Sequence, residues 1–491
     1  MKKSFFPNGE VTPKGVEEAI KEIDPFENDL YKRTDDIGTS RLFSDIFSNV
    51  LRYNTTAKEW YFYDGIVWRI DLEGMNTEKY AKIFQRALYI YSADIQDDRY
   101  RKYVASLGDR KKRTTMIQDA RETNCVCAED LDKDLSLFNC QNCVINLDTF
   151  EVMEHRSDLL LSKVANVQYN KEATSGEWEK FLFEVMCGDE VKTQYLQELF
   201  GYAMTGDCAQ EECYLLYGAT TRNGKSTTIE TVSNMFGDYS MNIQPESLAQ
   251  RKVKDSRTAS GDIARLDGCR LLHMSEPPKR MNFDVALLKT LLGKDKITAR
   301  HLHEREKEFV PIFKLFINTN YLPVVTDDTL FSSGRVKVIT FDRHFSEDEQ
   351  DIKLKSRLMS EDNMSGILNW CLEGLKRYHS NKDRLSVPPA VKNATDEYRK
   401  KSDKIQNFID ECLFKSEGNN LTAKEVYAEF EKWCQSNGYG TENKQNFLDE
   451  LRSKGILSQT GTVRGKTVKN VVKGYSLENS EDPESDLFPF Q

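Results

Sequence analysis

Gly224, Lys225 and Ser226 stand in a row near the middle of the chain, within the stretch GATTRNGKST at 218–227. A loop of this kind can turn backbone N–H groups toward a phosphate, and the helix that follows adds the positive end of its dipole. The lysine would neutralise the β and γ oxygens of a nucleotide, and the serine hydroxyl could ligate Mg²⁺. We therefore expect ATP and Mg²⁺ as cofactors. The expected nucleotide contacts are Ala219, Thr220, Thr221, Arg222, Asn223, Gly224, Lys225, Ser226 and Thr227.

The loop departs from the simplest phosphate-binding pattern at its start. Counting back from Gly224 places Ala219, and not Gly218, at the first loop position. The loop is therefore one residue longer after Gly218 than the simplest form, and alanine stands where glycine is usual.

Hydrolysis of a bound nucleotide needs further groups, and three residues later in the chain could provide them. Glu276 follows an apolar stretch at 270–274 and could hold Mg²⁺ through water or activate the attacking water. Asn320 ends the apolar stretch at 313–320 and could orient that water. Arg335 could offer a cation to the γ-phosphate bound by a neighbouring subunit.

Each of these residues also has a plain structural interpretation. Glu276 could be a solvated acid at a strand end, Asn320 a turn former, and Arg335 a surface charge. Their order after the loop favours catalysis. The predicted catalytic set is Lys225, Glu276, Asn320 and Arg335, and the predicted magnesium ligands are Ser226 and Glu276.

The flanking segments predict the elements that would position these residues. CYLLY at 213–217 predicts a strand that enters the loop, and TIETVSNMF at 228–236 predicts the helix that leaves it. Helical spacing predicts two helices before them. Strands separated by helices indicate an α/β layered domain. The further predicted segments are helices within 178–207 and 367–378 and strands at 270–274, 313–320 and 335–341.

The N-terminal third has a mixed pattern. EWYFYDGIVWRI at 59–70 alternates around Asp64-Gly65, which predicts a β-hairpin. The segment 137–155 predicts two strands around a turn at Asp148.

The C-terminal part predicts a winged helix-turn-helix, because three helical segments precede two strand-like pieces. Thr422 and Glu425 form a capping box for the second helix. The final ribbon has four basic residues and no acid, which in an acidic protein indicates a phosphate backbone as partner. A solvated hairpin in a protein–protein module is the alternative. The basic residues are Arg464, Lys466, Lys469 and Lys473.

Composition limits the class of protein. The 491 residues predict about three domains, and the net charge of −10 excludes a chain that binds nucleic acid over its whole surface. We find no apolar run of about 20 residues and no secretory signal, so no membrane contact is expected and the cytoplasm is the expected location. Eleven cysteines without a signal peptide indicate reduced thiols.

Four of these cysteines could form a zinc site. Cys125 and Cys127 are followed by Cys140 and Cys143. One residue between the first two is short for a zinc knuckle, and CVINL reads as an apolar strand. Small buried hydrophobes are the simpler interpretation.

Taken together, the segment from about 178 to 342 resembles the helicase domain of superfamily 3, in the branch of poxvirus and phage or plasmid primase-helicases. The residues that carry the resemblance are GATTRNGKST, RLLHMSEPPK, GKDKITARHLHEREKEFVPIFKLFINTNYLP and the arginine in SSGRVKVITF. The region from about 35 to 178 resembles the preceding domain of that branch through YFYDGIVWR and NCVINLDT. The C-terminal module resembles its winged helix. TLFSSGRVK replaces a common Trp-Arg-Arg, so Arg335 is the best match for the trans arginine.

The resemblance implies an α/β AAA+-type P-loop ATPase core with a mixed α+β N-terminal domain and a C-terminal winged helix. It implies a ring, commonly a hexamer, with ATP at each interface. A hairpin lining the channel would pull single-stranded DNA with 3′ to 5′ polarity. Here that hairpin would be ITARHLH and EFVPIFKLF, with Glu304 to Lys307 at its tip and Arg305 and Lys307 as phosphate contacts.

The expected division of the chain has six parts. They are an N-terminal arm at 1–45, an accessory domain at 46–177, the helicase domain at 178–378, a linker at 379–402, the winged helix at 403–478 and an acidic tail at 479–491. Most such tails are disordered, but this one could also dock a replication protein.

Three functions agree with these features. The first is an ATP-driven replicative DNA helicase of a phage or mobile element, which would act on single-stranded and forked DNA in a bacterial cell. The second is a primase-helicase, for which Asp130-Leu-Asp132 is the best carboxylate pair, although none of the six histidines follows the Ser-x-His pattern. The third is an origin-binding initiator that uses ATP as a switch.

Overall fold

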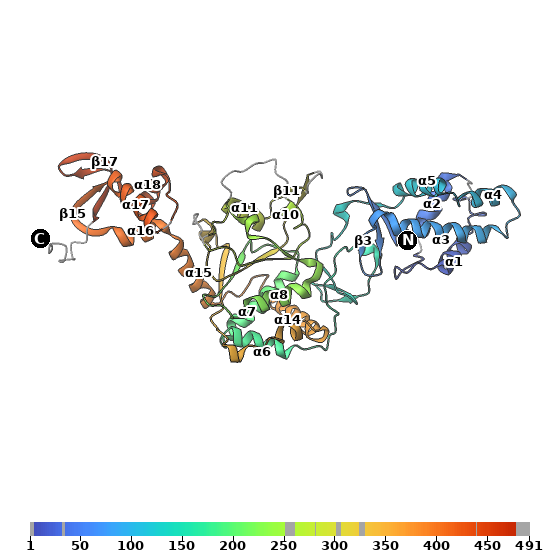
Figure 1. Ribbon diagram of the computed structural model, residues 1–491, viewed down its shortest axis with the longest axis horizontal. Helices are drawn as coiled ribbons and strands as arrows, with labels where there is room; N and C mark the ends of the chain where they lie inside the picture. The colour runs from blue at the N-terminus through green and yellow to red at the C-terminus, as the bar shows by residue number, and fades with distance from the viewer. Residues whose placement is uncertain are drawn as a thin grey trace.

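The computed structural model describes residues 4–31, 35–250, 261–279, 281–300, 306–323, 329–437 and 439–477. An N-terminal part, a central part and a C-terminal part follow one another along the molecule (Figure 1).

The centre of the molecule is a parallel β-sheet. In the described part of the chain it has five strands in the order β14-β8-β13-β10-β9, and each neighbouring pair is parallel. The strands are rich in buried apolar residues, as strands covered on both faces require. The four strands predicted from sequence are confirmed, and β9 is additional. The strands are β8 (Cys213–Tyr217), β9 (Ser240–Asn242), β10 (Leu271–Ser275), β13 (Lys314–Thr319) and β14 (Val336–Thr340).

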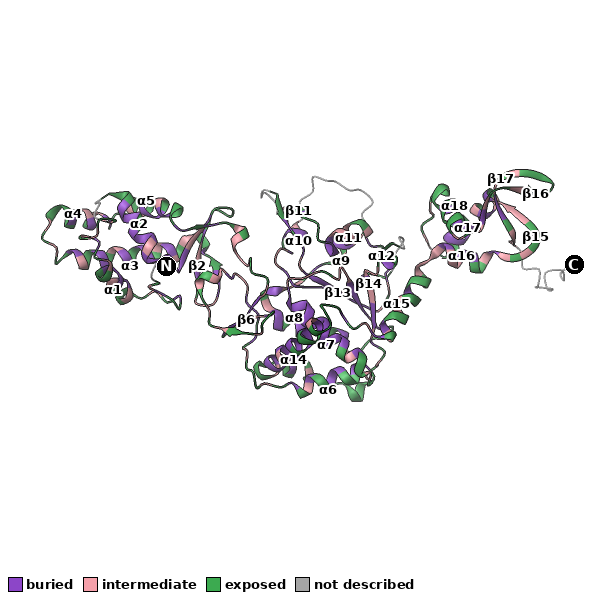
Figure 2. Ribbon diagram, turned by 180° about the vertical axis from the view of Figure 1, so that it is seen from behind, coloured by how far each residue is buried: buried purple, intermediate pink, exposed green. Residues whose placement is uncertain are grey.

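Helices cover both faces of this sheet, and alternate residues of β8 contact them. Tyr214 and Leu216 belong to the core on one face, and Cys213 and Leu215 to the core on the other. The first face carries α6 (Gly176–Val185), α7 (Glu190–Met204), α8 (Lys225–Phe236) and α14 (Glu361–Ser380). The second carries α9 (Pro245–Leu248), α10 (Gly261–Ala264), α11 (Val285–Leu292), α12 (Thr329–Ser332) and α15 (Pro389–Ser402). Figure 2 shows buried residues along the central strands and on the helices that cover them.

Two glycines bring α7 and α14 into backbone contact. A Cβ on Gly374 would lie 1.9 Å from the Gln197 carbonyl oxygen, and one on Gly201 would lie 2.3 Å from the Leu375 nitrogen. No side chain larger than hydrogen fits at either crossing point. This close contact fixes α14 on α7, the helix that precedes β8.

The N-terminal part differs from its expected division. The segment 1–45 is not an arm, because Phe6, Val16 and Phe43 are buried in the same core as Phe84. The expected hairpin at 59–70 is confirmed. The helices are α1 (Pro13–Ile23), α2 (Asp36–Ile46), α3 (Met75–Ser92), α4 (Asp98–Ser106) and α5 (Arg110–Asp119). The strands are β1 (Leu51–Asn54), β2 (Glu59–Tyr63), β3 (Trp68–Ile70) and β4 (Cys125–Val126), in the order β3-β2-β1-β4.

A small antiparallel sheet connects this part to the centre. Its strands are β5 (Leu137–Asn139), β6 (Val144–Asn146) and β7 (Val152–Met153). The turn expected at Asp148 joins β6 and β7. A second turn at Cys140–Cys143, where the Cys140 N–H donates to the Cys143 carbonyl at 2.8 Å, was not expected.

The C-terminal part has the three expected helices and two expected strands, together with an additional strand β15. Its strand order is β15-β17-β16. β15 has the polar sequence FKSEGNNLT and lacks the apolar alternation that marks a strand, so pairing with β17 decides its conformation. The capping box is confirmed, since Thr422 and Glu425 hydrogen-bond to each other reciprocally. The elements are α16 (Lys404–Cys412), β15 (Phe414–Thr422), α17 (Ala423–Asn437), α18 (Lys444–Ser453), β16 (Leu457–Val463) and β17 (Lys466–Ser476).

Part of the expected linker belongs to the central core. Helix α15 packs on the edge strand β14, where the Val338 N–H donates to Thr395 Oγ1 at 3.0 Å. Tyr398 is buried and donates to the Pro323 carbonyl at 2.6 Å. The helix therefore covers a sheet edge that would otherwise be open.

Short elements complete the described chain. They are the 3-10 helices η1 (Leu72–Gly74), η2 (Ala120–Glu122), η3 (Ala128–Asp130), η4 (Ser157–Leu159), η5 (Gly237–Tyr239) and η6 (Glu347–Glu349), the helix α13 (Leu354–Leu358) and the strands β11 (Ile297–Ala299) and β12 (Lys307–Phe309). Within the described ranges, every helix is too short or too polar to cross a membrane.

Two buried cations hold the C-terminal end of α7 at the amino edge of the sheet. Arg270 donates to the carbonyls of Met204 at 2.6 Å and Leu137 at 2.8 Å, and Lys314 donates to the carbonyl of Thr205 at 2.5 Å. A cation at this end of a helix is favoured by the helix dipole. Because Leu137 lies on β5, the same contacts attach the small sheet to the centre.

Lys314→Met should remove a pH dependence of stability. Burial, with the nearby Arg270 cation, lowers the pKa of Lys314 from 10.5 to about 7, so the unfolded chain binds more protons than the folded chain between these values. Stability should therefore rise with pH above 7, by roughly 1 kcal/mol per pH unit from this group. Urea unfolding of both proteins between about pH 7 and 8.5 checks this. Equal slopes would contradict it, since all other titrating groups are shared.

Candidate nucleotide-binding site

The glycine loop, residues 218–224, joins the carboxyl end of β8 to the start of α8. Gly224 has φ of 83°, a left-handed conformation that favours glycine, and a Cβ there would lie 2.5 Å from Val185 Cγ2. No side chain caps α8 in the described structure. The first N–H groups of this helix therefore have no intrahelical partner and point toward the loop, as an anion site requires.

Lys225 is the buried cation of this loop. Its side chain is 4% exposed, and its Nζ donates to Asn320 Oδ1 at 2.7 Å, Asn223 Oδ1 at 3.0 Å and the Gly218 carbonyl at 3.3 Å. Burial lowers the pKa of the amine to about 8, and the charge of Glu276 opposes this shift. The amine is thus held by neutral oxygens, which an anionic ligand can replace with gain in electrostatic energy.

Gly218 must be small for this arrangement. A Cβ on it would lie 2.2 Å from Asn223 Nδ2, 2.8 Å from the Phe341 carbonyl oxygen and 3.0 Å from Lys225 Nζ. The sequence places Ala219 at the usual glycine position, but the structure puts the steric requirement on Gly218. The position that must be small is shifted from Ala219 to Gly218 because the loop is one residue longer than the simplest form.

Glu276 and Asn320 lie on the same edge of the sheet as Lys225, as predicted. Both follow the carboxyl ends of neighbouring parallel strands, β10 and β13. Glu276 is exposed and has φ of 44°, a left-handed conformation that is rare for a non-glycine residue and that clusters at functional sites. Its backbone N–H donates to the Asn318 carbonyl at 2.9 Å.

Asn318 was not expected at the site. It is 3% exposed, and its Nδ2 donates to Ser226 Oγ at 3.0 Å. Its Oδ1 is buried without a hydrogen-bond partner in the described structure. The spacing offered a signal, because Asn318 and Asn320 stand two residues apart and therefore share one face of the strand.

These residues fit a nucleotide with Mg²⁺. The Ser226 hydroxyl contacts the buried amide of Asn318, and the charge of Glu276 acts on Lys225, so oxygen donors of the kind that magnesium prefers adjoin the loop. Thr220, Thr221, Arg222 and Thr227 lie in the loop or the first turn of α8. In the described ranges, no three side chains among His, Cys, Asp and Glu come together as a metal site, so the structure assembles no zinc site from Cys125, Cys127, Cys140 and Cys143.

The segment after β14 supports the glycine loop. The Phe345 N–H donates to the Arg222 carbonyl at 2.9 Å, and His344 Nδ1 lies 2.8 Å from the Thr221 carbonyl oxygen. Arg222 itself has φ of 56° and pairs with Glu347 at 3.4 Å. The loop is therefore fixed from the side of β14, a contact that the sequence did not predict.

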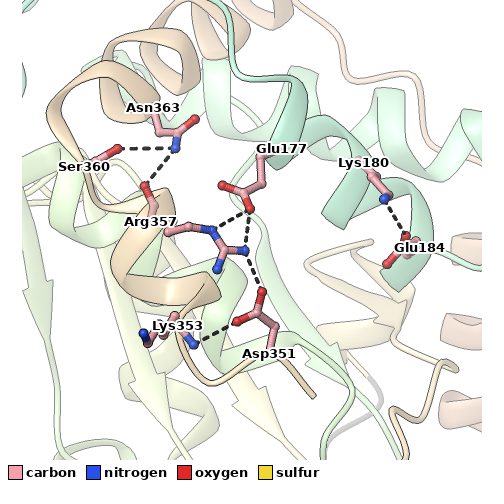
Figure 3. A network of polar contacts seen from close by, with 8 residues as sticks. All are labelled: Glu177, Lys180, Glu184, Asp351, Lys353, Arg357, Ser360 and Asn363. Atoms are coloured by element: carbon pink, nitrogen blue, oxygen red, sulfur yellow. Dashed lines mark hydrogen bonds and ion pairs between the residues drawn. The ribbon is translucent and has the colours of Figure 1, made fainter. Parts of the chain in front are cut away.

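A polar network anchors this supporting segment. Arg357 on α13 donates to Glu177 on α6 at 2.6 and 2.9 Å and to Asp351 at 2.6 Å (Figure 3). Lys355 pairs with Glu230 on α8. Exposed ion pairs contribute little energy singly. Here they connect α13 to the two helices that adjoin Gly224.

Arg335 lies at the opposite edge of the sheet. It precedes β14, and its carbonyl accepts from the Cys213 N–H at the start of β8, at 2.8 Å. A strand of five residues separates it from the edge that carries Lys225, which is about 16 Å by strand rise. Its guanidinium pairs with Glu211 and donates to the Lys289 carbonyl at 3.0 Å. Arg335 is therefore separated from the glycine loop of its own subunit by the length of β14, and its trans role stays a prediction.

The expected hairpin is present. β11 and β12 pair antiparallel, with Ala299 opposite Lys307. Lys307 pairs with Asp267. Lys307, predicted at the tip, therefore lies on a strand of the hairpin, because it pairs across the ladder with Ala299. Glu304 and Arg305 lie outside the described residues, so their place at the tip stays a prediction.

The predicted basic residues of the C-terminal ribbon are exposed. Arg464 pairs with Glu425 at 3.2 Å and is 82% exposed. Lys466 and Lys469 lie on β17 and are also exposed. These side chains could reach a phosphate backbone without unfolding the module.

Three family models match separate parts of the chain. Residues 40–187 match a model described as D5 N terminal like, residues 216–335 match a family of unknown function, and residues 400–480 match a model described as Poxvirus D5 protein-like.

Curated viral proteins and one solved structure are similar to the chain. A protein of Acanthamoeba polyphaga mimivirus, named as a helicase, is 26% identical over 63% of this chain and 34% of its own length. A protein of Invertebrate iridescent virus 3, also named as a helicase, is 22% identical over 91% of this chain and 55% of its own length. The chain thus spans about a third to a half of these relatives. The apo structure of the NrS-1 C terminal region is 13% identical, with a TM-score of 0.49 over 86% of this chain and 96% of that one.

The two D5-type models flank the central sheet and its glycine loop, and the relative from Invertebrate iridescent virus 3 covers 91% of the chain. The chain is therefore similar to D5-type proteins in its N-terminal and C-terminal parts, and together with the viral relatives this supports the superfamily 3 primase-helicase family that its motifs resemble.

Proposed function

We propose that this chain is an ATP-dependent DNA helicase that assembles as a ring, commonly a hexamer, and moves along single-stranded DNA, in the 3′ to 5′ direction. The helicase names of the viral relatives support a helicase or primase-helicase function. The observation that carries the proposal is the Lys225 amine, buried at the carboxyl edge of a parallel sheet and held by oxygens of Gly218, Asn223 and Asn320.

The fold supports an AAA+-type P-loop core for this role. The strand that enters the glycine loop lies inside the sheet, and the strands that carry Glu276 and Asn320 end at the same edge. ATP phosphates would replace the neutral oxygens around Lys225, and Mg²⁺ held by Ser226 and Glu276 would neutralise charge on the β- and γ-phosphates. Glu276 would activate the attacking water, which Asn320 would orient.

Ring assembly would complete this site. Arg335 faces away from the nucleotide of its own subunit, and only a neighbour's nucleotide could meet it. Release from Glu211 would then be part of catalysis, since the two side chains are paired here.

DNA would contact two basic surfaces. Lys307 and Arg305 on the hairpin would follow the strand inside the ring, and the C-terminal module would act as a winged helix through Arg464, Lys466 and Lys469. Forked DNA would be the natural substrate. In the same proposal, the acidic tail at 479–491 binds replication proteins. The proposed source is a phage or mobile element, with action in the cytoplasm of a bacterial host, while the curated relatives are viral proteins.

A priming centre on this chain is not favoured by the residues that could form one. Asp130 caps a 3-10 helix by accepting from the Cys127 N–H at 2.8 Å. Asp132 accepts hydrogen bonds from the backbone and hydroxyl of Ser162. Both carboxylates therefore hold local backbone. If the chain were instead an initiator that uses ATP as a switch, it would bind ATP, but DNA would not stimulate ATP hydrolysis.

Lys225→Ala should abolish DNA-stimulated ATP hydrolysis. Loss of a cation aimed at the transferred phosphate should cost a factor on the order of 100 or more. Steady-state hydrolysis with and without single-stranded DNA measures this. Lys180→Ala, which removes an exposed lysine on α6, serves as control and should retain full turnover. DNA-independent hydrolysis by the wild-type chain would contradict a DNA motor.

Nucleotide binding should take up a proton near pH 8. The free amine of Lys225 has a pKa of about 8, and phosphate favours its charged form, so the pKa rises in the complex. Affinity for a non-hydrolysable ATP analogue should therefore fall as pH rises through 8, with about half a proton bound per nucleotide at that pH. Calorimetry in buffers of different ionisation enthalpy measures the uptake. Equal uptake by Lys225→Met would show that another group is responsible.

Arg335→Ala should retain nucleotide binding but lose turnover by about 1,000-fold or more. Lys337→Ala, which removes the neighbouring ion pair with Glu212, is the matched control and should stay active. Mixing Arg335→Ala with Lys225→Ala subunits should restore part of the activity, because mixed interfaces contain one complete site. If Arg335→Ala is active and Arg343→Ala is not, the arginine assignment is wrong.

A further inference from the structure

We propose that Asn318 is the positioning residue for the magnesium ion of this site. Its amide holds the Ser226 hydroxyl at one end and binds a magnesium-bound water at the other. The inference rests on the proposed nucleotide site.

The first observation is that a polar atom of Asn318 is buried without a hydrogen-bond partner in the described structure. Asn318 is 3% exposed, and its Oδ1 has no hydrogen-bond partner within the described structure. Buried polar atoms are almost always hydrogen-bonded, so this oxygen requires a ligand or water. Whichever way the amide is turned, one end contacts Ser226 and the other end is left for that group.

The second observation concerns the supply of carboxylates. Strand β10 ends at Ser275, and Glu276 follows it, so this strand end provides one carboxylate. Asn318 stands directly opposite Ser275 in the parallel pairing of β10 and β13. Its side chain crosses to Ser226 at 3.0 Å, which places an amide beside the hydroxyl that would ligate the metal.

The chemistry of magnesium supports this role. Mg²⁺ keeps several waters and binds through few protein ligands, so residues that hold its waters and orient its ligands affect affinity. A donated N–H uses one lone pair of the Ser226 oxygen and leaves another for the ion. A free amide oxygen can accept from a metal-bound water.

Asn318 and Asn320 contact different groups of the site. Asn320 receives the Lys225 amine at 2.7 Å, so it is coupled to the phosphate-binding cation. Asn318 instead donates to the Ser226 hydroxyl. The two asparagines share one strand face but would serve the phosphate and the metal separately.

The test is a magnesium titration of nucleotide binding by the full-length chain. A fluorescent, non-hydrolysable ATP analogue is bound first in EDTA and then with increasing Mg²⁺. Asn318→Leu should raise the magnesium midpoint by about tenfold or more and leave affinity in EDTA unchanged. Asn318→Asp, which keeps a polar oxygen at the same place, should bring the midpoint back to near the wild-type value.

A matched control is Asn124→Ala in the N-terminal part. Asn124 is buried and donates one hydrogen bond to the Ser44 carbonyl, far along the chain from the loop. It should lose comparable stability without moving the magnesium midpoint. In a Ser226→Ala background, Asn318→Leu should shift the midpoint by less than it does in the wild type.

Three results would overturn the inference. The first is an unchanged midpoint for Asn318→Leu or, if that variant does not fold, for Asn318→Ala. The second is an equal loss of affinity in EDTA, which would indicate loop packing alone. The third is full additivity with Ser226→Ala. Absence of nucleotide binding by the wild-type chain overturns this inference and the proposed function together, whereas binding without unwinding overturns only the helicase.

Discussion

The buried amine of Lys225 is the constraint on which the site depends. A lysine in this position is stable only if oxygens surround it, and those oxygens come from the glycine loop and from the end of β13. This requirement fixes the small size of Gly218, the turn at Gly224 and the neighbouring position of β8 and β13. An anion bound in the loop offsets the free-energy cost of burying the Lys225 charge, because it supplies the opposite charge that the free site lacks.

The rest of the central part keeps this edge of the sheet in place. At the opposite edge, Arg270 and Lys314 bind the carbonyls at the end of α7 and connect the small sheet of β5, β6 and β7. On the loop side, α13 is joined to α6 through Arg357 (Figure 3) and to α8 through Lys355. The two edges have different roles: the amino edge holds the parts together, and the carboxyl edge gathers the polar side chains. This division follows from parallel pairing, which places all carboxyl ends together.

The position of Arg335 relates the fold to assembly. The parallel register separates it from Lys225 by the length of β14, while Glu211 and the Lys289 carbonyl satisfy its guanidinium within the subunit. A helix that had been expected as linker, α15, covers the edge of β14 beside it. The backbone of Arg335 and its strand are therefore fixed within the subunit, whereas its side chain would have to leave Glu211 before it could act across an interface.

The sequence by itself determined the strand–loop–helix order, four of the five described central strands, the capping box and the family, because these depend on local spacing, apolar runs and motifs. It did not determine that 1–45 folds into the N-terminal core, that 389–402 covers β14, or that the polar segment 414–422 forms a strand, since each follows from burial or pairing with distant residues. The grouping of Lys225, Glu276 and Asn320 at one edge of the sheet was predicted from their order along the chain. Asn318 and the contacts of His344 and Phe345 required the tertiary structure, because strand register and chain return bring them to the loop across about 100 residues.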